Sequence, residues 1–408
     1  MCAICGVVNI SSENVDGNVL SSMSERMYLR GPDEGGTYID GNVGLAHRRL
    51  SIIDLSTGNQ PMVINNGDIV IVYNGEVYNY KELRSELEAL GHVFVSTSDT
   101  EVVARCYVEY GIRDCLERLE GMFAFAIYDK VRNKVYVARD RYGEKPLYYY
   151  EDKQSLYFAS ELKAFNPSLD RFKIDITAIN LFLTLSYIPA PFTIYETIHK
   201  LQQGYYMEID NEKKYKICQY YNPRQDVHPV PTDNYDESKR ILKDLVRASV
   251  NSRMVSDVPM GAFLSGGIDS SIVCCLMARM SDEPINTFSI GFDEREYDES
   301  DRAEVVAKYI GSNHRKFILR YEDVLDILDD IISYYDEPFG DSSAIPSYYV
   351  AKLARNDVKV VLTGDCADEL FGGYEKYLAD YYSSKYRKIP KLLRRVFERI
   401  VNYVPQNE

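Results

Sequence analysis

From about residue 241 onward the sequence alternates apolar segments of strand length with segments of helical periodicity, and this alternation constrains the fold more than any other feature. Strands are expected over Val258–Leu264, Ile285–Gly291, His314–Leu319 and Val358–Thr363, and helices over Ile268–Met280, Arg302–Gly311, Glu322–Tyr334 and Ala344–Arg355. Strands separated by helices predict right-handed crossovers and therefore an α/β doubly wound parallel sheet. Binding sites in such sheets lie at the carboxyl ends of the strands.

The first half has a different pattern, in which short strand-like runs are separated by Gly, Asn and Asp. The clearest runs are Ile69–Tyr73, Phe123–Tyr128, Lys134–Ala138, Leu147–Tyr150 and Leu156–Ala159. Helices are expected at Leu20–Tyr28, Lys81–Leu90 and Glu101–Tyr110. This pattern predicts an α+β domain in which helices pack against layered β-sheets.

A chain of 408 residues is long enough for two domains that each bury a core. We expect a first domain at residues 1–210, a linker at 211–236 and a second domain at 237–408. The linker is predicted from the Pro, Asp and Gln residues that gather before residue 236.

Charge and composition exclude several classes of protein. The net charge of −15 argues against a nucleic-acid partner, because such proteins carry a basic face. No apolar run approaches the ~20 residues that span a bilayer, and the N-terminus lacks the basic and apolar regions of a signal peptide. The eight cysteines show no spacing typical of a disulfide framework, so we expect a cytoplasmic protein with no membrane partner.

Cys2 directly follows the initiator methionine, which makes it a candidate nucleophile. Removal of Met1 would give Cys2 a free α-amine whose pKa, near ~8, is close to that of the thiol. One residue could then supply both the nucleophile and its base. The alternative is a small apolar residue at the start of a strand. A CxxC metal or redox site with Cys5 is disfavoured, because residues three apart on a strand at Ile4–Ile10 point to opposite faces.

The loop Ser265-Gly-Gly-Ile-Asp-Ser-Ser271 joins a predicted strand to a predicted helix. Its glycines allow the backbone to approach an anion, and the helix N-terminus offers free N–H groups and a positive dipole end. Asp269 can hold a divalent cation. Because no Lys follows the glycines, the loop differs from the Walker A motif. It resembles the PP-loop of ATP pyrophosphatases, which cleave ATP between the α and β phosphates.

A second loop, Thr363-Gly-Asp-Cys-Ala-Asp-Glu-Leu-Phe-Gly-Gly-Tyr374, follows another predicted strand. The carboxyl ends of parallel strands meet at one edge of a sheet, so we expect the two loops to lie together. Asp269 and Asp368 could then share a Mg²⁺ ion that neutralises a pyrophosphate leaving group. The alternative role for these acidic residues is ordinary helix N-capping.

With Cys2 in front and these two loops behind, the chain resembles the glutamine-hydrolysing asparagine synthetases over essentially its whole length. In the first half the resemblance rests on Arg30-Gly-Pro-Asp33, Ala46-His-Arg-Arg-Leu-Ser-Ile-Ile-Asp54, Tyr73-Asn-Gly-Glu-Val-Tyr-Asn79, Ser98-Asp-Thr-Glu101, Gly121-Met-Phe-Ala-Phe-Ala126, Ala138-Arg-Asp-Arg-Tyr-Gly143 and Ala159-Ser-Glu-Leu-Lys163. In the second half it rests on the two loops and on Asp336-Glu-Pro-Phe339.

For the first half, the resemblance implies a class II glutamine amidotransferase domain with the N-terminal-nucleophile hydrolase fold. Cys2 would attack the side-chain amide of glutamine, giving a γ-glutamyl thioester and ammonia. The Asn74 side chain and the Gly75 N–H would form the oxyanion hole. The glutamine pocket would consist of Arg49 at the α-carboxylate, Glu76 and Asp99 at the α-ammonium, and the backbone of Leu50, Ser51, Ile52 and Ile53.

For the second half, the resemblance implies an adenine-nucleotide domain that activates aspartate as β-aspartyl-AMP, a step in which Asp365 would take part. Adenine would contact the backbones of Leu264, Ile290 and Gly364. The phosphates would lie on Ser265, Gly266, Gly267, Asp269, Ser270, Ser271 and Thr363. Ammonia would arrive through an internal channel and displace AMP. The implied substrates are glutamine, aspartate and ATP, with Mg²⁺, and relatives are often homodimers.

The sequence departs from the family in three places. Leu29 stands before Arg30 where a His is usual, and Cys366 and Ala367 stand where the second loop commonly has glycines. Relatives continue past the second loop with a helical segment bearing an Arg-x-Pro-Phe-Leu-Asp motif and a Lys near the ATP phosphates, so the second domain is expected to be C-terminally incomplete. Two alternatives stay open: a same-architecture amidotransferase acting on another carboxylate, and a glutaminase or ammonia-supplying protein with an incomplete synthetase domain.

Overall fold

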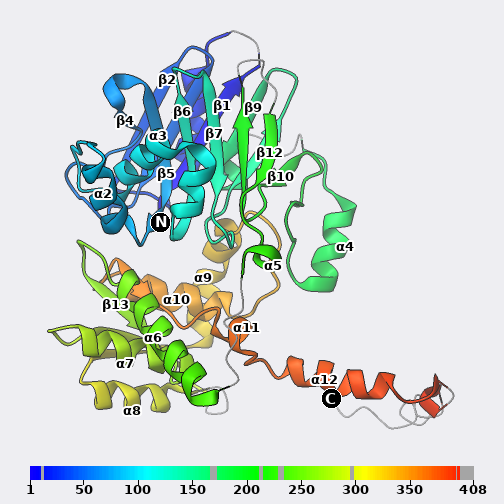
Figure 1. Ribbon diagram of the computed structural model, residues 1–408. Coiled ribbons are helices and arrows are strands. Elements are labelled where there is room, and N and C mark those ends of the chain that lie inside the picture. The colour runs from blue at the N-terminus through cyan, green and yellow to red at the C-terminus, as the bar shows by residue number, and fades with distance from the viewer. Residues whose placement is uncertain are drawn as a thin grey trace.

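Two six-stranded antiparallel sheets, stacked face to face, form the first half of the chain (Figure 1). The computed structural model describes residues 1–10, 13–165, 172–210, 215–227, 234–294, 298–391 and 393–395. The first sheet has the order β10 (Ile198–Lys200), β8 (Tyr148–Glu151), β9 (Ser155–Ala159), β1 (Ala3–Asn9), β3 (Val43–Arg49) and β2 (Glu34–Asp40). The second has the order β12 (Tyr215–Gln219), β11 (Tyr205–Ile209), β7 (Lys134–Arg139), β6 (Gly121–Asp129), β5 (Ile69–Val77) and β4 (Met62–Ile64).

The sequence of β5 shows why the two sheets stack. Val70 and Val72 point into the core between the sheets, where they join Ile4, Leu45 and Ala126. Their neighbours Ile69, Ile71 and Tyr73 point to the other face, which α2 (Tyr80–Ala89) and α3 (Asp99–Arg118) cover. Because successive residues of a strand face opposite sides, an unbroken apolar run produces a strand that is buried on both faces. Helix α1 (Gly17–Arg26) covers the outer face of the first sheet, giving four layers that confirm the expected α+β domain.

Several elements of the first half differ from the sequence-based expectation. The helix expected at Glu101–Tyr110 runs over the whole of α3, which Ser98 caps and in which Gly111, with a φ of +76°, allows a kink. Strands β2 and β3 and helix α4 (Ile176–Leu185) were not predicted. The remaining short helical segments are η1 (Asn65–Gly67), η2 (Leu162–Phe165) and α5 (Pro223–Asp226).

A four-stranded parallel sheet organises the second half. Its order is β15 (Asn313–Leu319), β14 (Asn286–Phe292), β13 (Met260–Phe263) and β16 (Val360–Leu362). Helices α6 (Tyr235–Arg253), α7 (Ile268–Met280) and α8 (Ser300–Ile310) share one core with it, and α10 (Ala344–Ala354) packs on the opposite face beside α9 (Tyr321–Tyr334). Helices on both faces of a parallel sheet confirm the doubly wound fold.

The segment between the halves is shorter than the linker expected at residues 211–236. Strand β12 lies inside that range and pairs antiparallel with β11, because the edge of β11 is open to a further strand. Helix α6 begins at Tyr235, where Asn234 accepts hydrogen bonds from the first turn. Residues 211–214 and 228–233 lie outside the described residues.

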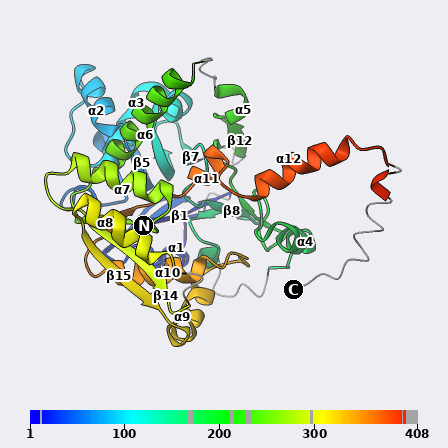
Figure 2. The ribbon, with the colours of Figure 1, turned by 90° about the horizontal axis from the view of Figure 1, so that it is seen from below.

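The end of the described chain extends away from both halves. After α11 (Ala367–Phe371), α12 (Lys376–Arg387) points outward in both views (Figures 1 and 2). Among the described residues, no helix has both the length and the apolar content needed to cross a membrane.

Candidate functional site

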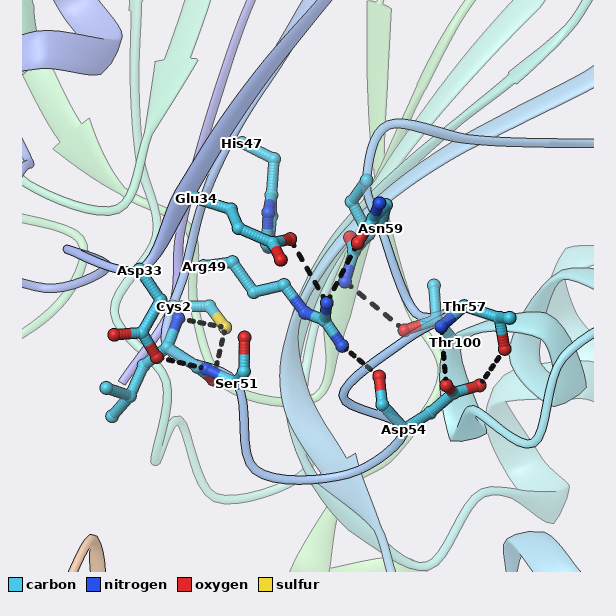
Figure 3. A network of polar contacts seen from close by, with 12 residues as sticks. Cys2, Asp33, Glu34, His47, Arg49, Ser51, Asp54, Thr57, Asn59 and Thr100 are labelled. Carbon is cyan, nitrogen blue, oxygen red and sulfur yellow. Dashed lines mark hydrogen bonds and ion pairs between the residues drawn. The ribbon is translucent and has the colours of Figure 1, made fainter. Parts of the chain in front are cut away.

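Cys2 lies at the start of β1, opposite the end of β3 (Figure 3). The antiparallel register pairs Ala3 with Arg48, which brings the thiol to the first residues after β3. There the Leu50 N–H donates to Cys2 Sγ at 3.4 Å, and Sγ lies 3.6 Å from the Leu50 carbonyl oxygen. The Arg30 Nε–H donates to the Cys2 carbonyl oxygen at 3.1 Å. Cys2, the predicted nucleophile, is therefore held by the backbone that follows β3 and by the Arg30 side chain.

The surroundings of Cys2 require a base and favour an amine in that role. Burial raises the pKa of the Cys2 thiol above its usual value, although the hydrogen bond from Leu50 opposes this. Burial also lowers the pKa of the Met1 α-amine to about 5, and the charges of Arg30 and Lys145 act in the same direction. The Met1 α-amine is therefore unprotonated at neutral pH, which is the state that a general base must have.

Asn74 and Gly75 lie side by side on β5, in a position that supports the predicted oxyanion hole. Asn74 is buried, and its Nδ2 has no hydrogen-bond partner within the described part of the chain. A buried amide donor without a partner is costly, so such groups commonly await a ligand. A Cβ on Gly75 would lie 2.4 Å from the Met122 carbonyl oxygen on β6, so this position requires glycine.

Arg49, predicted to bind a substrate carboxylate, is already surrounded by acceptors (Figure 3). Its Nη1 donates to Glu34 Oε2 at 3.1 Å and to Asn59 Oδ1 at 3.0 Å. Its Nη2 donates to the carbonyl oxygens of Ile53 at 3.2 Å and Asp54 at 2.5 Å. A guanidinium has five N–H groups, and these contacts occupy the four terminal ones. A bidentate bond to a ligand therefore requires Arg49 to exchange partners.

Glu76 and Asp99 form an acidic pair that could receive an ammonium group. Burial, followed by the charge of Asp99, raises the pKa of Glu76 well above its usual value. Burial likewise raises the pKa of Asp99. Hydrogen bonds from the Tyr73 hydroxyl at 2.8 Å and the Val77 N–H at 3.1 Å act in the opposite direction, but their effect is smaller. A cation placed between the two carboxylates would relieve both effects.

The residues after β3 form a fixed loop, residues 50–54, which we call the glutamine loop because the family resemblance predicts that it lines a glutamine pocket. The Ser51 N–H donates to Asp33 Oδ2 at 3.0 Å. Burial alone would raise the pKa of Asp54, but hydrogen bonds from Thr57 and Thr97 lower this pKa to about 2. Asp54 has a φ of +52°, a strained value for a residue other than glycine, so these bonds hold the loop in a shape it would not otherwise prefer.

Three residues of this site were missed by the sequence analysis. His47 on β3 places Nε2 3.0 Å from the Tyr73 carbonyl oxygen, next to Asn74. Asp33 and Asn59 hold the glutamine loop and Arg49, respectively. Both His47 and Asp33 belong to motifs that were noted for family resemblance, so the signal was present but carried no assigned role.

The two loops of the second half meet at the carboxyl ends of β13 and β16, as expected. A Cβ on Gly364 would lie 2.7 Å from the Ser270 backbone nitrogen, so only glycine allows this approach. Gly266, with a φ of +82°, leaves no room for a Cβ beside Ala303. The Ser265 and Ser270 hydroxyls lie 2.9 Å apart at the start of α7. The result is a cradle of glycine backbone, hydroxyls and a helix N-terminus, which suits phosphate groups.

The other predicted nucleotide-site residues lie at the same edge. Leu264 directly follows β13, Ile290 lies in the last part of β14 and Thr363 follows β16. The Thr363 hydroxyl donates to Asp365 Oδ2 at 2.7 Å. No group of three or more His, Cys, Asp or Glu side chains among the described residues could hold a metal by itself. A Mg²⁺ ion held by one or two carboxylates plus substrate phosphates would not need such a group.

Comparison with known proteins assigns a family to each half. Residues 1–221 match a glutamine amidotransferase domain, and residues 241–405 match an asparagine synthase domain. A Methanocaldococcus jannaschii protein provisionally described as a glutamine-hydrolysing asparagine synthetase is 38% identical over 98% of this chain and 81% of its own length. Asparagine synthetase [glutamine-hydrolyzing] 1 of Bacillus subtilis is 36% identical over 100% of this chain. The chain spans 64% of that Bacillus protein.

Proposed function

This chain belongs to the glutamine-hydrolysing asparagine synthetases, and from that premise we propose that it converts aspartate to asparagine with nitrogen from glutamine and energy from ATP. The observation that carries this proposal is the buried Asn74 Nδ2, a donor without a partner among the described residues. Asn74 lies two residues along β5 from Glu76, whose charge acts on the Cys2 thiol. The glycine-rich cradle of the second half supports the ATP-dependent part.

In the first step Cys2 Sγ attacks the side-chain carbonyl carbon of glutamine, while its α-amine, freed by removal of Met1, takes the thiol proton. Asn74 Nδ2–H and the Gly75 N–H donate to the oxygen on which negative charge develops. The α-ammonium returns this proton to the amide nitrogen, which leaves as ammonia when the C–N bond breaks. The acyl group remains as a γ-glutamyl thioester, and water then hydrolyses it to glutamate and frees the thiol.

Recognition of glutamine is assigned to the charged residues around Cys2. Arg49 exchanges Glu34 for the substrate α-carboxylate, and Glu76 with Asp99 binds the α-ammonium. The backbone of Leu50 to Ile53 lines the pocket. The raised pKa values of the two carboxylates support this assignment, since an arriving cation stabilises both ionised forms.

In the second half an aspartate β-carboxylate attacks the α-phosphate of ATP, giving β-aspartyl-AMP and pyrophosphate. We assign the phosphates to residues 265–271 and Thr363, the adenine to Leu264, Ile290 and Gly364, and a role in adenylation to Asp365. Ammonia from Cys2 then displaces AMP. An internal path would protect ammonia from protonation by solvent and so preserve its nucleophilicity.

Mg²⁺ is part of the proposal because ATP enters such reactions with a divalent cation. Asp269 and Asp368 would hold it, together with the phosphates. Carboxylates next to a glycine cradle are the oxygen ligands that Mg²⁺ prefers. A cytoplasmic location and a homodimer complete the proposal, and the eight free cysteines support the former.

The proposal is tested by measuring pyrophosphate and asparagine formation by the full chain with ATP, Mg²⁺ and aspartate, using glutamine or ammonia as nitrogen donor. We expect formation with either donor. Cys2→Ala should abolish activity with glutamine and leave activity with ammonia. Replacing aspartate by other carboxylates tests for a same-architecture enzyme with another acceptor.

A second candidate function is glutamine hydrolysis without amide synthesis. One observation favours it: the Asp365 side of the nucleotide cradle is exposed, whereas the Cys2 site is enclosed. In that case glutamate would form at the same rate with and without ATP and aspartate, and no pyrophosphate would appear.

A further inference from the structure

The second half of the chain contacts the glutamine loop directly, through Asp257 and Lys359. The Asp257 N–H donates to the Ile52 carbonyl oxygen at 3.1 Å, and the Asp257 carboxylate accepts the Asp54 N–H at 2.8 Å. Lys359 Nζ donates to Asp33 Oδ2 at 2.9 Å, the same oxygen that accepts the Ser51 N–H. Three of the loop's five residues are thus held by, or through, the other half.

These contacts lie on either side of the carbonyl groups that orient Arg49. The Ile53 and Asp54 carbonyl oxygens accept the two hydrogen bonds of Arg49 Nη2, of which Figure 3 shows the one to Asp54. Asp257 bonds to the Ile52 carbonyl oxygen and to the Asp54 N–H. These two groups lie immediately before and after the Ile53 carbonyl along the chain. Moving that short stretch moves the acceptors of the guanidinium. Asp257 therefore acts on Arg49 although it does not touch it.

Asp257 and Lys359 both lie next to strands of the parallel sheet. Lys359 directly precedes β16, and Asp257 comes three residues before β13, its neighbour in the parallel sheet. The Lys359 N–H donates to the Pro259 carbonyl oxygen at 3.1 Å, which ties the two strand entrances together. The opposite ends of the same strands lead into the two nucleotide loops. The residues that hold the glutamine loop therefore lie at the N-terminal ends of β13 and β16.

Interface contacts elsewhere provide a contrast. Lys163 Nζ donates to the Tyr334 carbonyl oxygen at 2.9 Å and pairs with Asp336 at 3.2 Å. This contact also joins the two halves, but it involves no residue of the glutamine loop. A role in holding the halves together is therefore separable from a role in shaping the glutamine site.

We propose that Asp257 and Lys359 are positioning residues of the glutamine site, so that the second half completes a pocket whose substrate contacts all come from the first. This inference rests on the proposed function. It predicts that loss of either contact weakens glutamine binding while leaving the chemistry at Cys2 unchanged, because neither residue reaches the reacting atoms.

The test compares full-length Asp257→Ala, Asp257→Asn, Lys359→Met and, as the control, Lys163→Met. Steady-state glutamate release gives KM and kcat, and calorimetry in the Cys2→Ala background gives the glutamine Kd without turnover. Asp257→Ala and Lys359→Met should each raise KM and Kd about fivefold, as expected for hydrogen bonds that solvent can reach, with kcat within about twofold. Asp257→Asn should stay within about twofold of the wild type, because its side-chain oxygen still accepts the Asp54 N–H.

Two results would overturn the inference: unchanged glutamine Kd in Asp257→Ala and Lys359→Met, or an equal rise in Lys163→Met. The second result would mean that any weakened interface loosens the site. Failure of the proposed function gives a different result, since the wild type would then form no asparagine and no pyrophosphate, or would release no glutamate at all. In that case the Kd series in the Cys2→Ala background still decides the inference, and absence of glutamine binding throughout would refute it as well.

Discussion

Glu34 Oε2 forms an ion pair with Arg49 Nη1 at 3.1 Å, close to Cys2 (Figure 3). The Arg49 side chain is 5% exposed, whereas that of Glu34 is 40% exposed. A buried guanidinium needs a counter-charge, and Glu34 supplies it in the free protein. Under the proposed function, the substrate carboxylate and Glu34 compete for the same cation.

The first prediction is that Glu34→Gln strengthens glutamine binding. Loss of the competing charge should lower the KM for glutamine about two- to fivefold, the modest range expected because Glu34 is partly exposed. The kcat for glutamate release should not change. Asp40→Asn, at the other end of β2, breaks an ion pair with Lys130 and serves as the matched control. A rise in KM for Glu34→Gln would show instead that Glu34 orients Arg49 for the substrate.

The second prediction concerns the free energy of unfolding and the acidic pair. The folded-state pKa of Glu76 lies above its unfolded value, so deprotonation costs stability as pH rises from about 4.5 through the folded pKa. Glu76→Gln should therefore be more stable than the wild type at pH 7, by ~1.4 kcal/mol for each unit of pKa elevation. The same variant should bind glutamine at least tenfold more weakly, because the α-ammonium loses a counter-charge.

Urea unfolding at pH 4.5 and pH 7 measures the first effect, and the KM for glutamine measures the second. The stability difference between Glu76→Gln and the wild type should be small at pH 4.5 and larger at pH 7. Glu82→Gln on α2, where the side chain is exposed, provides the control. Lower stability of Glu76→Gln at pH 7 would show that Glu76 is stabilised by partners in the free protein.

The third prediction concerns acid stability and His47. Burial lowers the pKa of His47 to about 3, below the ~6.5 of an unfolded chain. The unfolded state therefore binds the proton first, and stability falls by ~1.4 kcal/mol per pH unit between about pH 6.5 and pH 3. His47→Gln keeps a donor for the Tyr73 carbonyl but does not titrate. Between pH 7 and pH 5 its stability should fall by ~2 kcal/mol less than that of the wild type, measured by urea unfolding. Parallel curves would mean that His47 has the same pKa in the folded and unfolded states, so that burial does not lower it.

The sequence was sufficient to predict features in which neighbouring residues act together. Asn74 and Gly75 adjoin on β5, and residues 265–271 form one loop, so their shared positions follow from the local chain. Contacts between segments far apart in the chain could not be predicted from the sequence. Asp257 bonds to Asp54 across 203 residues of chain, and no periodicity in either segment indicates the partner.

Local patterns also failed where tertiary pairing decides the structure. Strand β12 lies in a polar stretch that reads as a linker, and it forms because β11 offers an open edge. Helix α4 has few buried residues and no apolar stripe that a period of 3.6 would reveal, so its pattern gave no helix signal. The partners of Arg49 were likewise unpredictable, since Glu34 and Asn59 approach it from a different strand and from a loop.

The last prediction separates the oxyanion role of Asn74 from binding. Its Nδ2 has no partner in the described part of the free protein, so any bond it makes is gained when negative charge develops on the substrate oxygen. Asn74→Ala should then lower kcat for glutamate release about 100- to 1,000-fold and leave the KM for glutamine within about threefold. Asn74→Asp should be at least as inactive, because a carboxylate repels the developing oxyanion.

Asn79→Ala removes an exposed amide that is already bonded to the Arg118 carbonyl and should keep wild-type kcat. Activity with ammonia should be unchanged in all three variants, which shows that each protein is folded. If Asn74→Ala instead raised KM with kcat preserved, Asn74 would belong to ground-state recognition and the oxyanion would depend on the Gly75 N–H.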